Sequence, residues 1–246
     1  MNMIELKNLT KKFGNIVAVN RLNLSVSKGE IFGFIGPNGA GKTTTLRMMG
    51  GVLVPTEGSV TIDGLNIARE PEKAKKKIGF IPDRPFLYEK LTGMEFLRFT
   101  ADLYGVEDAV FREKSEEILK KFLLYDWRDE LIESYSHGMK QRLIISAAIL
   151  HDPKVIVVDE PMVGLDPAGM NMVKGLFRDL AQKGTTLFMS THTLAMAEDV
   201  CDRIGIIHKG VLIATGTIEE LKRKAQVREG DLEKVFLILT EGESIP

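Results

Sequence analysis

The chain is poor in three features that would point to other classes of protein. Its one cysteine, Cys201, excludes an internal disulfide framework, suits a reducing cytosol and is expected to be a small buried residue. The formal net charge is -1, whereas general nucleic-acid binders usually carry a basic surplus. No uninterrupted apolar run approaches the roughly 20 residues that span a bilayer. We therefore expect a soluble protein without a nucleic-acid partner, which can still act at a membrane.

The first 13 residues carry charges where a secretory signal peptide has its apolar segment. We therefore expect no cleaved leader. At 246 residues the chain can bury one core, or one core with a smaller satellite domain.

Short apolar runs alternate with helical periodicity along the chain, which predicts an α/β fold with a largely parallel sheet. Residues 22–27 alternate leucine or valine with polar side chains, as expected of a half-buried strand. Denser apolar runs at 30–36, 155–160 and 185–192 are typical of buried parallel strands.

Residues 88–151 have the pattern of packed helices. Thr92 and Glu95 have capping-box spacing at the start of one helix. Four apolar residues are predicted to share a face of a later helix: Ile118, Leu119, Phe122 and Leu123. We predict an α-helical subdomain over 88–151, inserted into an α/β core formed by 1–87 and 152–246.

Residues 36–44 read GPNGAGKTT and fit the phosphate-loop pattern G-x-x-x-x-G-K-[ST], between an apolar strand and a plausible helix. Glycines let successive N–H groups point at phosphate oxygens, and the helix N-terminus adds partial positive charge. We expect Lys42 to bridge the β- and γ-phosphates and the Thr43 hydroxyl to enter the octahedral shell of Mg²⁺. The other predicted nucleotide contacts in the loop are Gly36, Pro37, Asn38, Gly39, Ala40, Gly41 and Thr44.

Two acidic residues and a histidine follow two other predicted strands. Asp159 is the candidate to hold Mg²⁺ through water, and Glu160 the candidate to polarise the attacking water. His192 is the candidate contact to the γ-phosphate. An acidic pair after a strand can instead cap a helix, and a lone histidine can simply pack. The phosphate loop favours the catalytic interpretation, because ligands of open α/β sheets bind at the carboxyl ends of strands.

With these residues in place, the chain resembles the ATP-binding subunit of an ABC transporter over nearly its whole length. The resemblance implies one ABC ATPase domain over 1–246. Its P-loop NTPase core would have a mainly parallel sheet, an N-terminal antiparallel β portion and the inserted helical subdomain. It also implies ATP and Mg²⁺ as ligands, ATP hydrolysis, and a head-to-tail homodimer or heterodimer. The resemblance further implies a separate membrane permease as partner and a peripheral position on the cytoplasmic face of the membrane.

Residues 135–142, YSHGMKQR, resemble the signature segment of that family. The resemblance implies that Ser136 and Gly138 hold the γ-phosphate of an ATP bound by a partner subunit. Three positions depart from the family pattern: Tyr135 in place of leucine, His137 in place of glycine and Met139 in place of glutamine.

Three further residues take roles from the resemblance. Phe13 sits where the family stacks an aromatic ring on adenine, and a core phenylalanine is the alternative. Asp166, within VGLDP, is placed to contact the opposing subunit. Asp83 replaces a glutamine that senses Mg²⁺ and the permease, and a plain turn residue is the alternative.

The export-type subfamily, which handles drugs, lipids, polysaccharides or ions, is the most similar in residues 104–114, 138–143 and 231–240. Two alternatives remain open: a soluble ABC-type ATPase outside transport, and a nucleotide-gated switch with little turnover. Glu160 and His192 favour hydrolysis over the switch. The transported substrate, its direction and the permease do not follow from the sequence.

Overall fold

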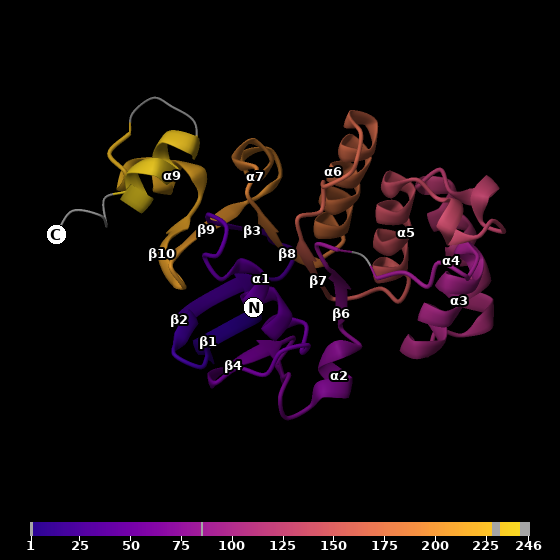
Figure 1. Cartoon of the computed structure of the whole chain (residues 1–246), viewed down its shortest axis with the longest axis horizontal. Helices are drawn as coiled ribbons and strands as arrows, with labels where there is room; N and C mark the ends of the chain where they lie inside the picture. Colours follow the sequence, from indigo (N-terminus) through magenta and orange to yellow (C-terminus); the bar gives the residue numbers. More distant parts are fainter. Residues whose placement is uncertain (1, 85, 228–231, 242–246) are drawn as a thin grey trace.

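The computed structural model describes residues 2–84, 86–227 and 232–241 (Figure 1). The strands are β1 Asn2–Phe13, β2 Ile16–Ser27, β3 Ile31–Ile35, β4 Glu57–Ile62, β5 Leu65–Asn66, β6 Ile78–Ile81, β7 Val155–Asp159, β8 Thr186–Thr191, β9 Arg203–His208 and β10 Val211–Gly216. The α-helices are α1 Lys42–Met49, α2 Pro71–Lys75, α3 Gly93–Tyr104, α4 Asp108–Lys121, α5 His137–Ile149, α6 Pro167–Gln182, α7 Leu194–Val200, α8 Ile218–Lys224 and α9 Leu232–Glu241. Short 3₁₀ turns are η1 Tyr125–Trp127 and η2 Ile132–Ser134.

The strands form two sheets. One is antiparallel with the order β2-β1-β4-β5, and the other has the order β10-β9-β3-β8-β7-β6. In the second sheet, β6, β7, β8, β3 and β9 run parallel, and β10 joins antiparallel at its edge. The predicted fold class is confirmed: an α/β protein with a mainly parallel sheet, an N-terminal antiparallel portion and helices inserted between β6 and β7.

Each face of the parallel sheet packs on a buried apolar cluster, because successive side chains along a strand point to opposite faces. In β7, Val155 and Val157 join the cluster that also contains α1 and the antiparallel sheet. Ile156 and Val158 join the cluster on the other face, with α5, α6 and α7. By the same alternation Asp159, the last residue of β7, is placed on the α1 side.

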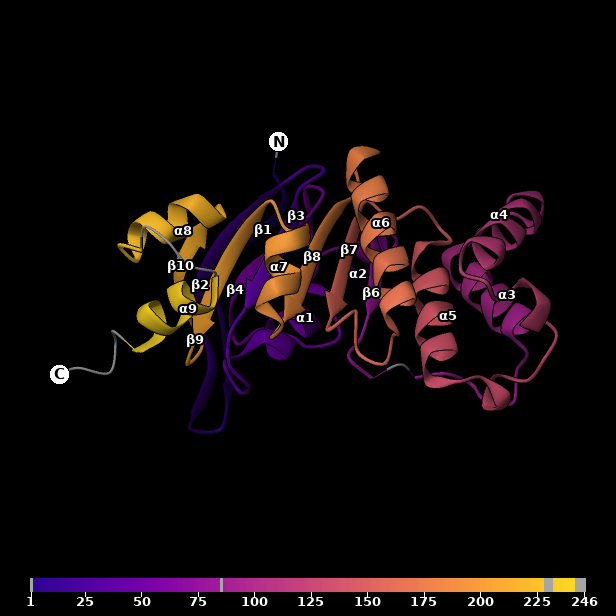
Figure 2. The same ribbon diagram turned by 90° about the horizontal axis from the view of Figure 1, so that it is seen from above.

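The helices α3, α4 and α5 lie at one end of the molecule, and α8 and α9 lie at the other (Figures 1 and 2). The capping box of α3 forms as predicted, with Thr92 and Glu95 exchanging hydrogen bonds. A single apolar cluster runs from Phe96 and Leu97 of α3 through α5 to the parallel sheet. The boundaries at 87/88 and 151/152 stay predictions. In the part of the chain that the structure describes, no helix is long and apolar enough to cross a bilayer.

The predicted helical face at 118–123 is wrong at Leu123. Helix α4 ends at Lys121, and Leu123 takes a left-handed φ of +56° with its side chain 69% exposed. The Leu124 amide donates to the Leu119 carbonyl and the Leu123 amide to the Lys120 carbonyl, which is a Schellman ending. Leu124 is therefore the residue that is buried beside Leu119.

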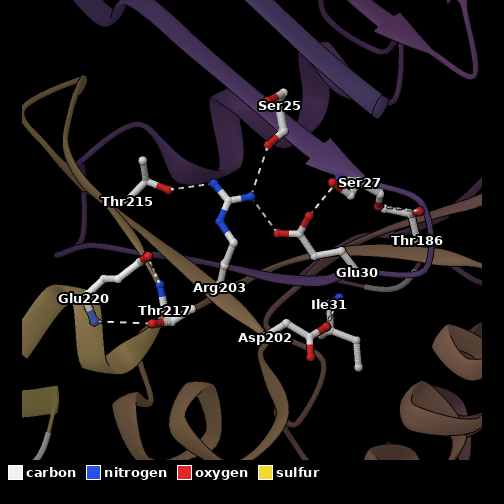
Figure 3. A network of polar contacts seen from close by, with 10 residues as sticks. All are labelled: Ser25, Ser27, Glu30, Ile31, Thr186, Asp202, Arg203, Thr215, Thr217 and Glu220. Atoms are coloured by element: carbon white, nitrogen blue, oxygen red, sulfur yellow. Dashed lines mark hydrogen bonds and ion pairs between the residues drawn. The ribbon is translucent and has the colours of Figure 1, made fainter. Parts of the chain in front are cut away.

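A polar network joins the two sheets at the start of β3 (Figure 3). The buried Glu30 carboxylate accepts from the Arg203 guanidinium at 2.8 Å and from the Ser27 amide at 2.6 Å. Arg203 also donates to the Ser25 carbonyl, and the Thr186 hydroxyl donates to the Ser27 carbonyl. The turn between β2 and β3 is thereby fixed to β8 and β9.

Candidate nucleotide-binding site

The phosphate loop follows β3, and α1 begins within it at Lys42. The loop lies at one wall of a cavity of about 310 Å³. Its lining residues come from the loop and from the ends of several strands: Ala18, Asn38, Gly39, Gly41, Lys42, Thr43, Thr44, Asp83, Asp159, Glu160, Val163 and His192. Most residues predicted for phosphate and metal chemistry therefore share one cavity.

Backbone geometry explains two of the loop's glycines. A Cβ atom at Gly36 would overlap the carbonyl oxygen of Ile207 in β9. Gly41 has a φ of +106°, and its Cβ would lie 2.5 Å from the Ala18 carbonyl oxygen. The loop can pass this close to β2 and β9 only because these positions carry no side chain.

Lys42 is held by the loop that precedes it. Its ammonium donates to the carbonyls of Gly36 at 2.6 Å and Pro37 at 3.2 Å. Burial lowers the pKa of Lys42, while the nearby Glu160 and Asp159 carboxylates oppose that shift. The Lys42 ammonium thus lies near two of the three carboxylates that line the cavity.

Asp159 is oriented by the neighbouring strand. It is paired with Ser190 in the parallel ladder, and the Ser190 hydroxyl donates to its carboxylate. Thr43, Asp83 and Asp159 line both this cavity and an adjoining one of about 340 Å³. The three predicted metal ligands are therefore brought together, with Asp83 exposed in a bend.

Glu160 and His192 face one another. The Glu160 carboxylate lies 2.8 Å from His192 Nδ1 and accepts from the Thr191 hydroxyl at 3.3 Å. Its amide donates to the Ser190 carbonyl, and its φ is +50°, which is uncommon for a residue other than glycine. Asp159 ends the strand, so this turn of the backbone directs Glu160 toward His192.

The donor set suits magnesium better than a metal held by protein alone. Among the described residues, no group of three or more His, Cys, Asp or Glu side chains is placed to hold a metal ion. Magnesium needs no such group, because phosphates and water supply most of its ligands beside one or two carboxylates. Thr43 and Asp159, which both line the cavity, fit that arrangement.

Three residues of the phosphate loop, Gly36, Pro37 and Ala40, do not line the cavity, and neither do four predicted contacts on other segments. Phe13 is 48% exposed at the end of β1, so the alternative of a core phenylalanine is wrong. Ser136 caps α5 by accepting from the Met139 amide, and Gly138 follows in its first turn. Asp166 caps α6 by accepting from the Gly169 amide at 2.8 Å.

Two residues with clear contacts received no role from the sequence. The Tyr135 hydroxyl donates to the Trp127 carbonyl at 2.6 Å, and burial raises its pKa to about 12. Gln141 is 1% exposed, and its amide donates to the Pro161 carbonyl at 3.5 Å. The only signal was their place in the signature segment.

A phosphate loop between a strand and a helix, with carboxylates at the ends of adjacent parallel strands, defines a P-loop nucleotide hydrolase. The family model described as "ABC transporter" matches residues 19–163, and the chain belongs to this family.

Several relatives resemble the chain over most of its length. It is 34% identical, over 99% of both chains, to the ABC-type transporter ATP-binding protein EcsA of Bacillus subtilis. It is 40% identical to the bacitracin transport ATP-binding protein BcrA of Enterococcus faecalis, over 94% of this chain and 74% of that one. The linearmycin resistance ATP-binding protein LnrL of Bacillus subtilis is 38% identical, over 89% of this chain and 70% of that one.

Solved structures agree with the fold. An ATP-binding subunit of an ABC transporter matches with a TM-score of 0.92 and 33% identity, over 96% of this chain and 99% of that one. A dimeric ATP-binding cassette in a post-hydrolysis state, with ADP and Pi, matches with a TM-score of 0.77 and 28% identity, over 87% of this chain and 98% of that one. The chain is an ATP-binding and ATP-hydrolysing subunit of an ABC transporter, as predicted.

Proposed function

We propose that two such cassettes close head to tail around two ATP molecules with Mg²⁺ and so drive a separate permease from the cytoplasmic face of the membrane. The observation that carries this proposal is the division of the site. The cavity contains the phosphate loop, Asp159, Glu160 and His192, whereas Ser136 and Gly138 lie outside it. A second chain can supply them.

Within one chain, Lys42 neutralises phosphate charge, and Glu160 polarises the water that attacks the γ-phosphate. His192, 2.8 Å from Glu160, holds that carboxylate in place and contacts the γ-phosphate. Thr43 and Asp159 would hold Mg²⁺, which supplies further neutralisation of phosphate charge when bound. Phe13 stacks on the adenine.

From the facing chain, the N-terminus of α5 contributes the remaining contacts. Ser136 is exposed, and the first amides of the helix point beyond its N-terminus. Such a helix end attracts anions because its partial charge is positive. Asp166, also exposed, contacts the opposing subunit from the start of α6.

An exposed aromatic cluster supports the position of the permease. Phe86, Tyr88 and Phe99 are 78%, 49% and 41% exposed, with successive ring centroids 5.7 and 5.4 Å apart. Apolar patches of this kind mark interaction sites. The cluster follows Asp83 closely along the chain, so a permease seated there is near the metal end of the cavity. Relatives named for linearmycin resistance and bacitracin transport favour export.

Thiol cross-linking tests the head-to-tail dimer. Cys201 is buried, and burial raises its pKa to about 12, so Cys201→Ala gives a thiol-free background without placing a hydroxyl there. Asn38→Cys and Ser136→Cys are then combined with Glu160→Gln, which favours the closed state. A short bifunctional thiol linker should give covalent dimers on a denaturing gel. ATP with Mg²⁺ should strongly increase their yield, because the negative phosphates offset the positive charge of the phosphate loop and of the facing N-terminus of α5.

Each single cysteine variant serves as the control, since neither should give the same ATP-dependent product. Cross-links formed only within one chain, or a yield of covalent dimers that does not depend on ATP, would contradict the proposed arrangement.

Asp83 gives a test of the metal site. If its carboxylate belongs to the Mg²⁺ environment, Asp83→Gln should shift the Mg²⁺ concentration for half-maximal ATPase activity at least about threefold, because an anionic ligand is lost. Asp83→Ala should also weaken coupling to the permease. Asp129→Asn, an exposed substitution in the helical region, is the matched control. Unchanged metal dependence in both Asp83 variants would leave Asp83 as a bend residue.

A further inference from the structure

The histidine in the signature segment packs directly on a glycine of another loop. Gly164, with a φ of +80°, lies so close to His137 that a Cβ atom there would overlap Cδ2 and Nε2 of the imidazole. It would also lie 3.1 Å from Cγ of the same ring. While the ring stays in this position, the contact leaves no room for a side chain at position 164.

Two further contacts join the same parts of the chain. A Cβ at Gly138 would lie 3.2 Å from the Gly164 carbonyl oxygen, so the two backbones also approach closely. The buried Gln141 amide donates to the Pro161 carbonyl at 3.5 Å. The first turns of α5 therefore lie along the segment 161–165.

That segment also reaches the nucleotide site of its own chain. It begins directly after Glu160, and Val163 lines the cavity. The Val163 amide donates to the Glu160 carbonyl at 3.3 Å, and the Leu165 amide donates to the Met162 carbonyl at 3.2 Å. One short turn-rich segment thus follows Glu160 directly and contacts α5 at both Pro161 and Gly164.

We propose that His137 is a positioning residue for ATP hydrolysis. Its ring holds segment 161–165 against the start of α5, so the placement of Glu160 in one site depends on the placement of Ser136 in the other. This inference rests on the proposed head-to-tail dimer. His137, like Ser136, does not line the cavity of its own chain. The contact through which it acts on Glu160 and Ser136 is its packing on Gly164.

A double-mutant cycle measures this contact. Asn tolerates positive φ, so Gly164→Asn introduces a Cβ with little backbone strain. In the otherwise native chain it should lower kcat about tenfold or more, whereas in a His137→Gly background it should lower kcat less than about threefold. Residual strain at position 164 is common to both backgrounds and cancels. Equal losses in the two backgrounds would overturn the inference.

Met139→Gln is the matched control, because Met139 lies in the same helical turn and its combination with Gly164→Asn should be additive. A positioning role predicts that His137→Gly lowers kcat while the Kd for ATP and the melting temperature stay near native values. A lower kcat together with weaker ATP binding and a lower melting temperature would mean that the ring is only structural, and would overturn the inference. His137→Gln, whose planar amide can replace part of the ring, should recover part of the lost kcat, and no recovery would count against the proposal.

The dimer is tested separately by gel filtration of Glu160→Gln with native His137. If ATP fails to produce a dimer there, the proposed arrangement fails and this inference with it. If the dimer forms but the cycle is additive, only the role of His137 is overturned.

Discussion

Glu160→Gln is expected to lower ATP turnover by about two orders of magnitude or more while ATP binding stays nearly unchanged. The amide keeps the size of the carboxylate and can still contact His192, but it cannot polarise water as an anion does. The mutant should therefore collect in the ATP-bound closed state. Single-site ATP titration gives the affinity, phosphate release gives the turnover, and gel filtration with ATP reports the dimer.

Glu116→Gln is the matched control, because Glu116 lies on the surface of α4, where it pairs with Lys120. It should retain native turnover. Hydrolysis by Glu160→Gln within a fewfold of native would contradict the assignment of Glu160 and would leave its contact with His192 without a catalytic purpose.

Lys42→Met is expected to raise the Kd for ATP at least about tenfold and to lower turnover at least about a hundredfold. Two effects act in the same direction. First, the phosphates lose the positive charge of Lys42. Second, Asp159 and Glu160 lie close enough to Lys42 to act on its pKa, and without the ammonium their negative charges would repel the phosphates. Lys42→Arg should also fail, because a planar guanidinium cannot replace a compact ammonium between the carbonyls of Gly36 and Pro37.

Lys121→Met is the control, since Lys121 pairs with Asp179 on the surface. This variant should keep native ATP affinity and native turnover. ATP titration and phosphate release measure both effects. Native ATP affinity in Lys42→Met would contradict the predicted phosphate contact.

The sequence predicts the parts of this molecule that depend on local pattern. The strand, glycine loop and helix around Lys42 are continuous in the chain, and so is the capping box at Thr92. The three dense apolar runs predict buried strands. The helices predicted between them indicate that these strands run parallel. Because parallel strands end at one edge, Asp159, Glu160 and His192 were predicted to meet there.

The features that the sequence did not predict depend on contacts between distant segments or on backbone turns. The ion pair of Glu30 and Arg203 joins residues far apart in the chain, and neither has a local pattern that marks it. Leu123 continues a helical periodicity, yet the Schellman turn places it in solvent because Leu124 is buried in its stead. The fit of His137 against Gly164 depends on how two loops approach one another in space.

The network around Glu30 and Arg203 has a mechanical consequence. Because it fixes the turn after β2 to β8 and β9, the sheet that carries Phe13 and the sheet that carries the phosphate loop move as one body. The group of helices α3–α5 is joined to that body by two chain crossings and by apolar packing, which has no preferred direction and allows sliding. Polar contacts, among them Gln141 to Pro161 and Lys121 to Asp179, also cross this border. We therefore expect the helical end to supply the rotational freedom, while the spacing between adenine and phosphate contacts stays constant throughout the cycle.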